Sequence, residues 1–165
     1  MNNPVVTIDL SKYLQDFLYH EFDQSVTRDE PLMINTKNDI GRFIQSMVTV
    51  TDLPHKQELK ESPMEVSLPV REWNHAVFRR NFIYIPEWKQ KQIRLYVESL
   101  FRLRIREFFS IGYAKGFKQD TIIRAFLEHY NIKHNALSYE TVKKYDYRTR
   151  RKLREEIAKE IVSIL

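Results

Sequence analysis

The sequence predicts an α+β fold, with a small sheet and helices in residues 1–85 and a helical, basic unit in residues 86–165. Two patterns support this prediction. In the first part, short runs of alternating apolar and polar residues have the two-residue period of half-buried strands. After Pro86, apolar residues recur every three or four positions, which is the period of helices. The 165 residues are enough to bury a hydrophobic core without cross-links.

Four short strands are expected in the first part. Val5–Leu10 and Glu65–Val70 alternate between apolar and polar residues, whereas Leu32–Ile34 and Asn81–Ile85 are short apolar runs. Together they indicate a small antiparallel or mixed sheet.

Two helices are expected between these strands. The first carries Leu14, Leu18 and Phe22 at four-residue spacing, and the second carries Ile40, Phe43, Ile44, Met47 and Val48 on one face. Thr36 and Asp39 resemble a capping box at the start of the second helix. Residues 52–63 are expected to form a loop, and so are residues 71–80, in which Trp73 would act as an anchor.

Three helices are expected in the second part. The first begins at Pro86, and Gly112 and Gly116 mark its end. Another covers Gln119–Tyr130. After a turn at Asn131–Leu137, Ser138 is expected to cap a last helix that continues almost to residue 165.

Charge is distributed unevenly along the chain. Residues 1–70 hold 6 Lys and Arg against 11 Asp and Glu, a net charge of −5, whereas the remaining residues hold 21 against 11, a net charge of +10. This asymmetry favours an acidic folding or docking module joined to a basic contact surface.

The basic residues are concentrated in Ser138–Arg154, which has two faces when it is drawn as a helix. Val142, Tyr145, Thr149 and Leu153 form a packing face. The opposite face is interpreted as a nucleic-acid-binding surface, because Lys and Arg neutralise phosphates and polar groups near a helix start reach base edges. Its candidate residues are Ser138, Tyr139, Thr141, Lys143, Lys144, Tyr147, Arg148, Arg150, Arg151 and Arg154, and a secondary basic face holds Arg94, Arg102 and Arg106.

Within residues 119–154, the segments Asp120–Leu127 and Ser138–Lys144 resemble the supporting and recognition helices of helix-turn-helix DNA-binding domains of bacterial, phage or mobile-element type. The resemblance implies that the second helix enters the major groove of duplex DNA while the first crosses the backbone. It suggests a non-enzymatic DNA-binding protein, for example a regulator or accessory factor of a phage or mobile element.

Two other classes of function stay open. A structural or assembly protein of phage type would use the basic helix against an acidic subunit or packaged nucleic acid. The apolar stripe of residues 86–110 offers a surface for a protein partner or a homo-oligomer. An enzyme would need a carboxylate cluster in the first half of the chain, and a loss of activity on changing Asp9 or Asp23 would be its signature.

Several chemistries are not expected. The chain has no Cys, which removes disulfides, thiolate nucleophiles and zinc fingers, and its 3 glycines form no phosphate-binding loop. His129 and His134 match no metal motif, and a tyrosine nucleophile among Tyr139, Tyr145 and Tyr147 is not supported because one helix points these side chains in different directions. We therefore expect no catalytic residue, cofactor or metal. The absence of a leader or a long apolar run predicts a cytoplasmic protein without a membrane segment.

Overall fold

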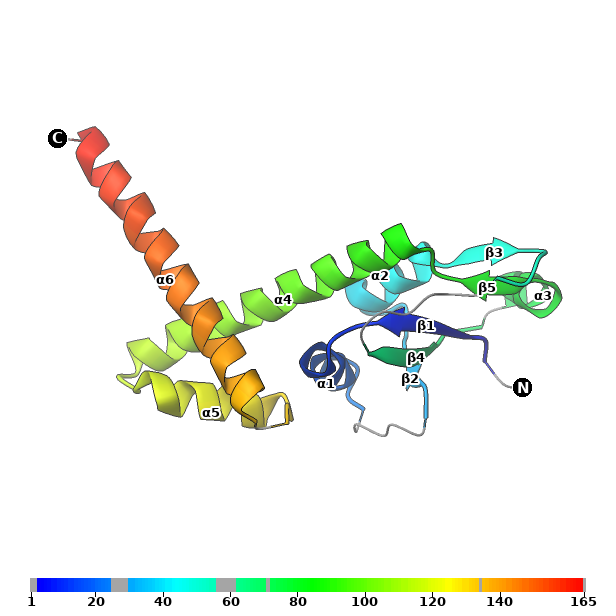
Figure 1. Ribbon diagram of the computed structural model, residues 1–165, viewed down its shortest axis with the longest axis horizontal. Coiled ribbons are helices and arrows are strands. Elements are labelled where there is room, and N and C mark those ends of the chain that lie inside the picture. The colour runs from blue at the N-terminus through cyan, green and yellow to red at the C-terminus, as the bar shows by residue number, and fades with distance from the viewer. Residues whose placement is uncertain (1–2, 25–29, 56–61, 71, 134, 165) are drawn as a thin grey trace. The chain divides into compact units, whose positions relative to one another are not determined.

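The computed structural model describes residues 3–24, 30–55, 62–70, 72–133 and 135–164, except for the side chains of residues 72, 73, 75, 79, 136 and 137. It confirms the α+β class, with all strands of the described chain in the first part and helices alone in the second (Figure 1). The chain divides into two compact units, Met1–Glu98 and Ser99–Leu165. This boundary lies inside a long helix, whereas the sequence places it after residue 85.

The sheet of unit 1 is mixed. β1 (Val5–Asp9) pairs antiparallel with β4 (Pro63–Ser67), and β2 (Leu32–Met33) pairs parallel with the other edge of β4, giving the order β1-β4-β2. A separate antiparallel pair joins β3 (Thr49–Thr51) to β5 (Phe82–Tyr84). β3 was not expected from the sequence, because three residues with an exposed Val50 are too few for an alternating pattern.

Three helices accompany these strands: α1 (Lys12–Glu21), α2 (Asp39–Met47) and α3 (Glu72–Arg80). The expected capping box at the start of α2 is wrong. Asn38 is the N-cap, and its Oδ1 accepts hydrogen bonds from the backbone N–H groups of Ile40 at 2.7 Å and Gly41 at 3.1 Å. Asn38 fills this role because it directly precedes the first helical residue, Asp39, so its side-chain oxygen can reach the free N–H groups of the first turn.

The loop expected at residues 71–80 is also wrong, because nine of these residues form α3. Asn81 follows the last turn of α3 and donates a hydrogen bond from Nδ2 to the carbonyl of Val77 at 2.8 Å, which satisfies one of the orphan carbonyls at the helix end. The anchoring role expected for Trp73 concerns a side chain outside the described ones. The loop expected at residues 52–63 falls largely on residues 56–61, outside the described residues.

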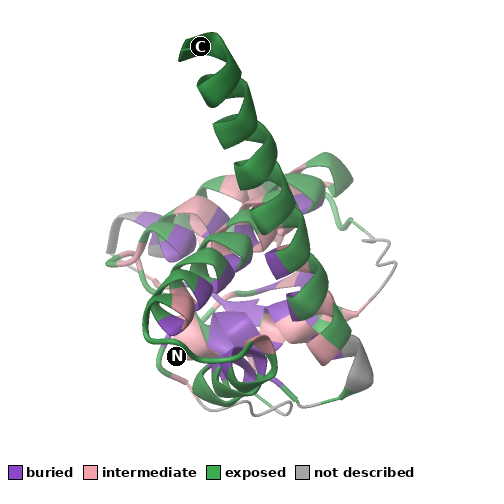
Figure 2. Ribbon diagram, turned by 90° about the vertical axis from the view of Figure 1, so that its left-hand side faces the viewer, coloured by how far each residue is buried: buried purple, intermediate pink, exposed green. Residues whose placement is uncertain are grey.

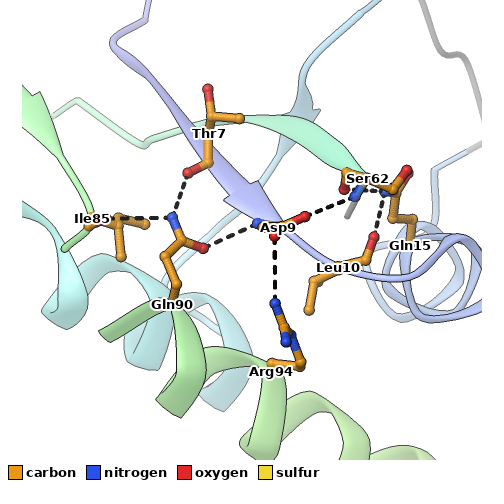
Figure 3. Close-up of polar contacts among 8 residues, drawn as sticks. All are labelled: Thr7, Asp9, Leu10, Gln15, Ser62, Ile85, Gln90 and Arg94. Atoms are coloured by element: carbon orange, nitrogen blue, oxygen red, sulfur yellow. Dashed lines mark hydrogen bonds and ion pairs between the residues drawn. The ribbon is translucent and has the colours of Figure 1, made fainter. Parts of the chain in front are cut away.

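A set of buried polar contacts ties the first turns of α4 (Glu87–Ala114) to β1 (Figure 3). Gln90 Oε1 accepts from the backbone N–H of Asp9 at 3.0 Å, and Gln90 Nε2 donates to the carbonyl of Thr7 at 2.9 Å. The buried Asp9 carboxylate accepts from the backbone N–H of Ser62 at 2.8 Å and pairs with Arg94 at 3.4 Å. These contacts explain why unit 1 extends into α4.

Unit 2 holds the rest of α4, then α5 (Gln119–His129) and α6 (Ala136–Ile164). Gly116 follows the last turn of α4 and takes a φ of +79°. The backbone N–H of Phe117 donates to the carbonyl of Gly112 at 3.0 Å, which together with this left-handed residue forms a Schellman C-cap. Gly112 itself is a buried helical position.

Each unit has its own apolar core. In unit 1 the core includes Val6, Ile8, Leu14, Phe17, Leu18, Leu32, Ile40, Ile44, Val66, Leu68, Ile85, Ile93 and Val97. In unit 2 it includes Phe101, Ile105, Phe109, Ile122, Ile123, Phe126, Leu127, Tyr130, Ile132 and Val142. The apolar stripe of α4 is therefore mostly buried within the chain itself, whereas Leu95 and Leu103 of the same helix are exposed.

Candidate nucleic-acid interface

The candidate interface is built on the turn that joins α5 to α6. Asn131 ends α5 in the left-handed conformation, at φ +51°, a role that Gly usually fills. The backbone N–H of Ile132 then donates to the carbonyl of Leu127 at 2.9 Å, and the buried Ile132 side chain fixes the turn. Asn135 Oδ1 accepts from the backbone N–H of Ser138 at 2.8 Å. These contacts set the direction in which α6 starts.

The start of α6 differs from the sequence prediction. The helix begins at Ala136, and Asn135 supplies the capping oxygen that was expected from Ser138. Ser138 is therefore in the first turn and is buried, so its hydroxyl is not on the surface where contact with bases was expected. Tyr139 and Thr141 are half-buried, and the Tyr139 hydroxyl donates to Asp120 of α5 at 2.8 Å.

The inner face of α6 contains a buried carboxylate. Asp146 lies one turn after the buried Val142 and is itself buried. Its Oδ2 accepts hydrogen bonds from Tyr113 of α4 at 2.8 Å and from Gln119 of α5 at 2.6 Å, and it pairs with Arg150 at 2.9 Å. Charge and hydrogen bonds compensate this buried anion, which joins all three helices of unit 2.

The outer face of α6 carries a basic hollow of about 240 Å³ beside the start of α5. Four cationic side chains and one carboxylate line it, so its net formal charge is positive. Tyr147 stands at its edge with 63% of its surface exposed. The lining residues are Gln119, Glu140, Lys143, Lys144, Tyr147, Arg148 and Arg150.

The cations of the basic hollow differ in how far neighbouring carboxylates neutralise them. Arg150 is paired with Asp146, and Lys143 lies 3.8 Å from Glu140. Within the described residues, Lys144 and Arg148 have no carboxylate partner. These two side chains are therefore the least neutralised cations of the hollow.

The remaining predicted residues lie outside the basic hollow. Arg151 is exposed and pairs with Glu155 at 3.1 Å, and Arg154 is exposed on the next turn. Of the secondary basic face, Arg94 belongs to unit 1 and pairs with Asp9, whereas Arg102 belongs to unit 2 and lies over the Tyr145 ring at 4.9 Å. A separate groove between α4 and α6 is lined by residues that include Arg102 and Arg106.

Two tyrosines near the interface hold their protons more tightly than usual. Burial, followed by the hydrogen bond to Asp146, raises the pKa of Tyr113 to about 12. The hydrogen bond to Asp120 is the main cause that raises the pKa of Tyr139. Both shifts extend toward higher pH the range in which the phenol stays protonated and donates to these carboxylates.

The side chains considered for catalysis do not come together in the described part of the chain. The Tyr145 ring lies under Arg102, Tyr139 is bonded to Asp120, and Tyr147 faces solvent, so the three tyrosines do not converge. Asp9 is engaged in the contacts to α4, while Asp23 is exposed after α1. Among the described residues no three His, Asp or Glu side chains gather as metal ligands do, and His134 lies outside these residues.

Sequence reasoning missed three polar residues of this region: Gln119, Glu140 and Asp146. Asp146 carried a signal that went unused, because helical spacing places it beside Val142 and Thr149 on the packing side. Gln119 and Glu140 carried none, since their positions depend on how α5 and α6 pack.

Comparisons with protein-family models, with curated proteins and with solved structures find no match for this chain. In addition, no helix among the described residues is long and apolar enough to cross a membrane.

Proposed function

We propose that this protein binds duplex DNA through the first half of α6 and has no catalytic activity of its own. The basic hollow is the observation that carries the proposal, because four cations gather there around an open concave surface. Phosphate contacts by Lys and Arg supply most of the affinity of proteins for nucleic acid. Tyr147 adds an exposed hydroxyl of the kind that donates to phosphate oxygens.

The arrangement of the helices supports a duplex as the ligand. α6 packs on α5 and α4 with its inner face and leaves its basic face open, as a helix that enters a groove must. The major groove of B-form DNA admits an α-helix, whereas the major groove of A-form RNA is too narrow for side chains to read. A regulator or accessory factor of a phage or mobile element would bind duplex DNA in this way.

The test is an electrophoretic mobility shift with random duplex DNA. Because Lys143, Lys144 and Arg148 are exposed and belong to no core, changing all three to Ala should leave the protein folded and reduce its affinity by about tenfold or more. Changing Lys12, Lys37 and Lys91, exposed residues of unit 1, to Ala removes the same number of charges, and this matched control should leave affinity unchanged. Equal affinity of the triple variant and the wild-type protein would overturn the proposal.

A second candidate function is a structural or assembly role, and an exposed apolar face on the last turns of α6 favours it. Leu153, Ile157 and Ile161 lie on that face. A protein of this kind would form large assemblies without DNA, and its size by light scattering would be the same for the triple variant. If the wild-type protein instead binds duplex DNA and keeps a small, defined size without it, the DNA-binding function is favoured over the assembly role.

A further inference from the structure

The last turns of α6 are exposed on every side. Each residue from 151 to 164 is exposed, and Figure 2 shows the C-terminal end of the helix in the colour of exposed residues. Even so, Leu153, Ile157 and Ile161 recur every four residues, with 49%, 46% and 52% of their surfaces exposed, and Ile164 continues the same face. An amphipathic helix with its apolar face in solvent lacks the partner that its pattern requires.

A groove between α4 and α6 runs beside this apolar face, inside unit 2. It has a volume of about 340 Å³. Leu103 and Leu153 give it an apolar lining, and both are about half exposed at 46% and 49%. Three cations and one carboxylate, Glu156, surround them; the cations are Arg102, Arg106 and Lys152. The groove is therefore suited to an amphipathic segment with negative charge.

The second half of α6 has these properties itself. Residues 148–154 contain five Lys and Arg and no acidic residue, whereas residues 155–164 contain three Glu and one Lys. The helix is thus basic before Glu155 and acidic after it. Two copies of α6 in parallel would place like charges side by side, while an antiparallel pair places the acidic turns of each copy beside the basic groove of the other.

We propose that the occupant of this groove is a second copy of the same chain, whose α6 packs antiparallel on the first about a two-fold axis near Ile157. In this arrangement Leu153 faces Ile161 of the partner subunit, and the reverse contact repeats by symmetry. Lys152 comes within one helical turn of Glu160 of the partner subunit. Within the described residues of one chain, neither Lys152 nor Glu160 has an ion pair. The dimer does not depend on DNA binding.

Sedimentation equilibrium of the full chain, free of nucleic acid, tests this dimer. We expect a monomer–dimer equilibrium. Ile157→Ser should weaken it by about tenfold or more, since Ile157 lies at the axis and its change affects both subunits. As this side chain is exposed, the variant should keep the far-UV circular dichroism and thermal midpoint of the wild-type protein at a dilution at which both are monomeric.

Charge reversal tests the antiparallel direction. Lys152→Glu and Glu160→Lys should each weaken the dimer by about tenfold, because each change creates two repulsive pairs, and the double variant should recover wild-type affinity. The chain has no Cys, so a mixture of Leu153→Cys and Ile161→Cys proteins can be treated with a short thiol cross-linker. Cross-links between the two variants support the antiparallel pair.

Three outcomes would overturn the proposal. A wild-type protein that stays monomeric up to high micromolar concentration would assign the groove to another occupant. Leu153→Cys protein that cross-links to itself as readily as to the Ile161→Cys protein would indicate a parallel pair. Failure of the double charge reversal to restore the dimer would show that Lys152 and Glu160 do not meet.

Discussion

A single residue, Asp146, explains how α6 is held with its basic face outward. A buried carboxylate is costly unless charge and hydrogen bonds compensate it. Tyr113 and Gln119 donate to Asp146 from two other helices, and Arg150 supplies the opposite charge. Arg150 is thereby fixed at the edge of the basic hollow, which leaves Lys144 and Arg148 as its least neutralised cations.

The raised pKa of Tyr113 predicts how stability depends on pH. Because the pKa is about 12 in the folded protein and 10.0 for an unperturbed tyrosine, the unfolded chain loses this proton first as pH rises. The Tyr113 hydrogen bond makes its full contribution to the free energy of unfolding below pH 10.0, and this contribution is lost as pH rises toward about 12. Tyr113→Phe should therefore cost about 1 kcal/mol of unfolding free energy at pH 8, and less at pH 11.

Urea unfolding of both proteins at pH 8 and pH 11 measures this difference. Tyr147→Phe is the control, since Tyr147 is 63% exposed and has no hydrogen bond to a carboxylate among the described residues. A Tyr113→Phe cost that stayed constant from pH 8 to pH 11 would contradict the prediction.

Gly41 is required by close packing in α2. A Cβ at this position would lie 1.8 Å from the carbonyl oxygen of Asn35, and a backbone atom cannot move aside as a side chain can. Gly41→Ala should therefore destabilise the protein by about 2 kcal/mol, despite the better helix propensity of Ala. Thermal unfolding measures the effect.

Gly112→Ala is the matched comparison for Gly41→Ala. The atoms nearest to its Cβ would belong to the Ile122 side chain, at 2.7 Å, and a side chain can move more easily than a backbone carbonyl. We expect a smaller loss of stability for this variant than for Gly41→Ala. The reverse order of thermal midpoints would show that the packing at Asn35 is not rigid.

At the level of elements, the strands and helices whose sequence pattern is long enough to show a period were predicted well. The alternation in Val5–Leu10 and the helical spacing between Ile93 and Phe109 correspond to β1 and α4. The short β3 was missed because it forms by pairing with β5, which is distant in sequence. The helix α3 was also missed. Local propensity is a weak guide for such segments.

The candidate site shows the same limit. The basic face of α6 could be predicted, because charged residues at helical spacing define it without knowledge of packing. Helical spacing places Asp146 on the packing side, but its hydrogen-bond partners could not be read from the sequence, since Tyr113 lies 33 residues before it. The burial of Ser138 had no such signal. Tertiary contacts therefore decide which polar residues of a helix face inward.

The contacts between α4 and β1 can be tested through Gln90. Gln90→Ala removes an acceptor from the buried backbone N–H of Asp9 and a donor to the carbonyl of Thr7. We expect a loss of about 2–3 kcal/mol in unfolding free energy, because buried groups stay unsatisfied. The neighbouring Lys91 is exposed, and Lys91→Ala should change stability little. Similar denaturation midpoints for both variants would contradict the role assigned to Gln90.

At the level of the whole molecule, charge separates along the division into two units. Residues 1–98 hold 12 Lys and Arg against 14 Asp and Glu, a net charge of −2, whereas residues 99–165 hold 15 against 8, a net charge of +7. Attraction to a polyanion is therefore directed to unit 2, where the basic hollow lies.

The central claim is that the basic hollow contacts DNA phosphates, and the salt dependence of duplex affinity tests it most directly. The slope of log K against log salt concentration should be steep for the wild-type protein. It should become shallower by about 1.8 for the Lys144→Ala, Arg148→Ala double variant, because each lost phosphate contact changes it by about 0.9. The Lys12→Ala, Lys91→Ala control should keep the wild-type slope. A double variant with the wild-type slope would contradict the claim.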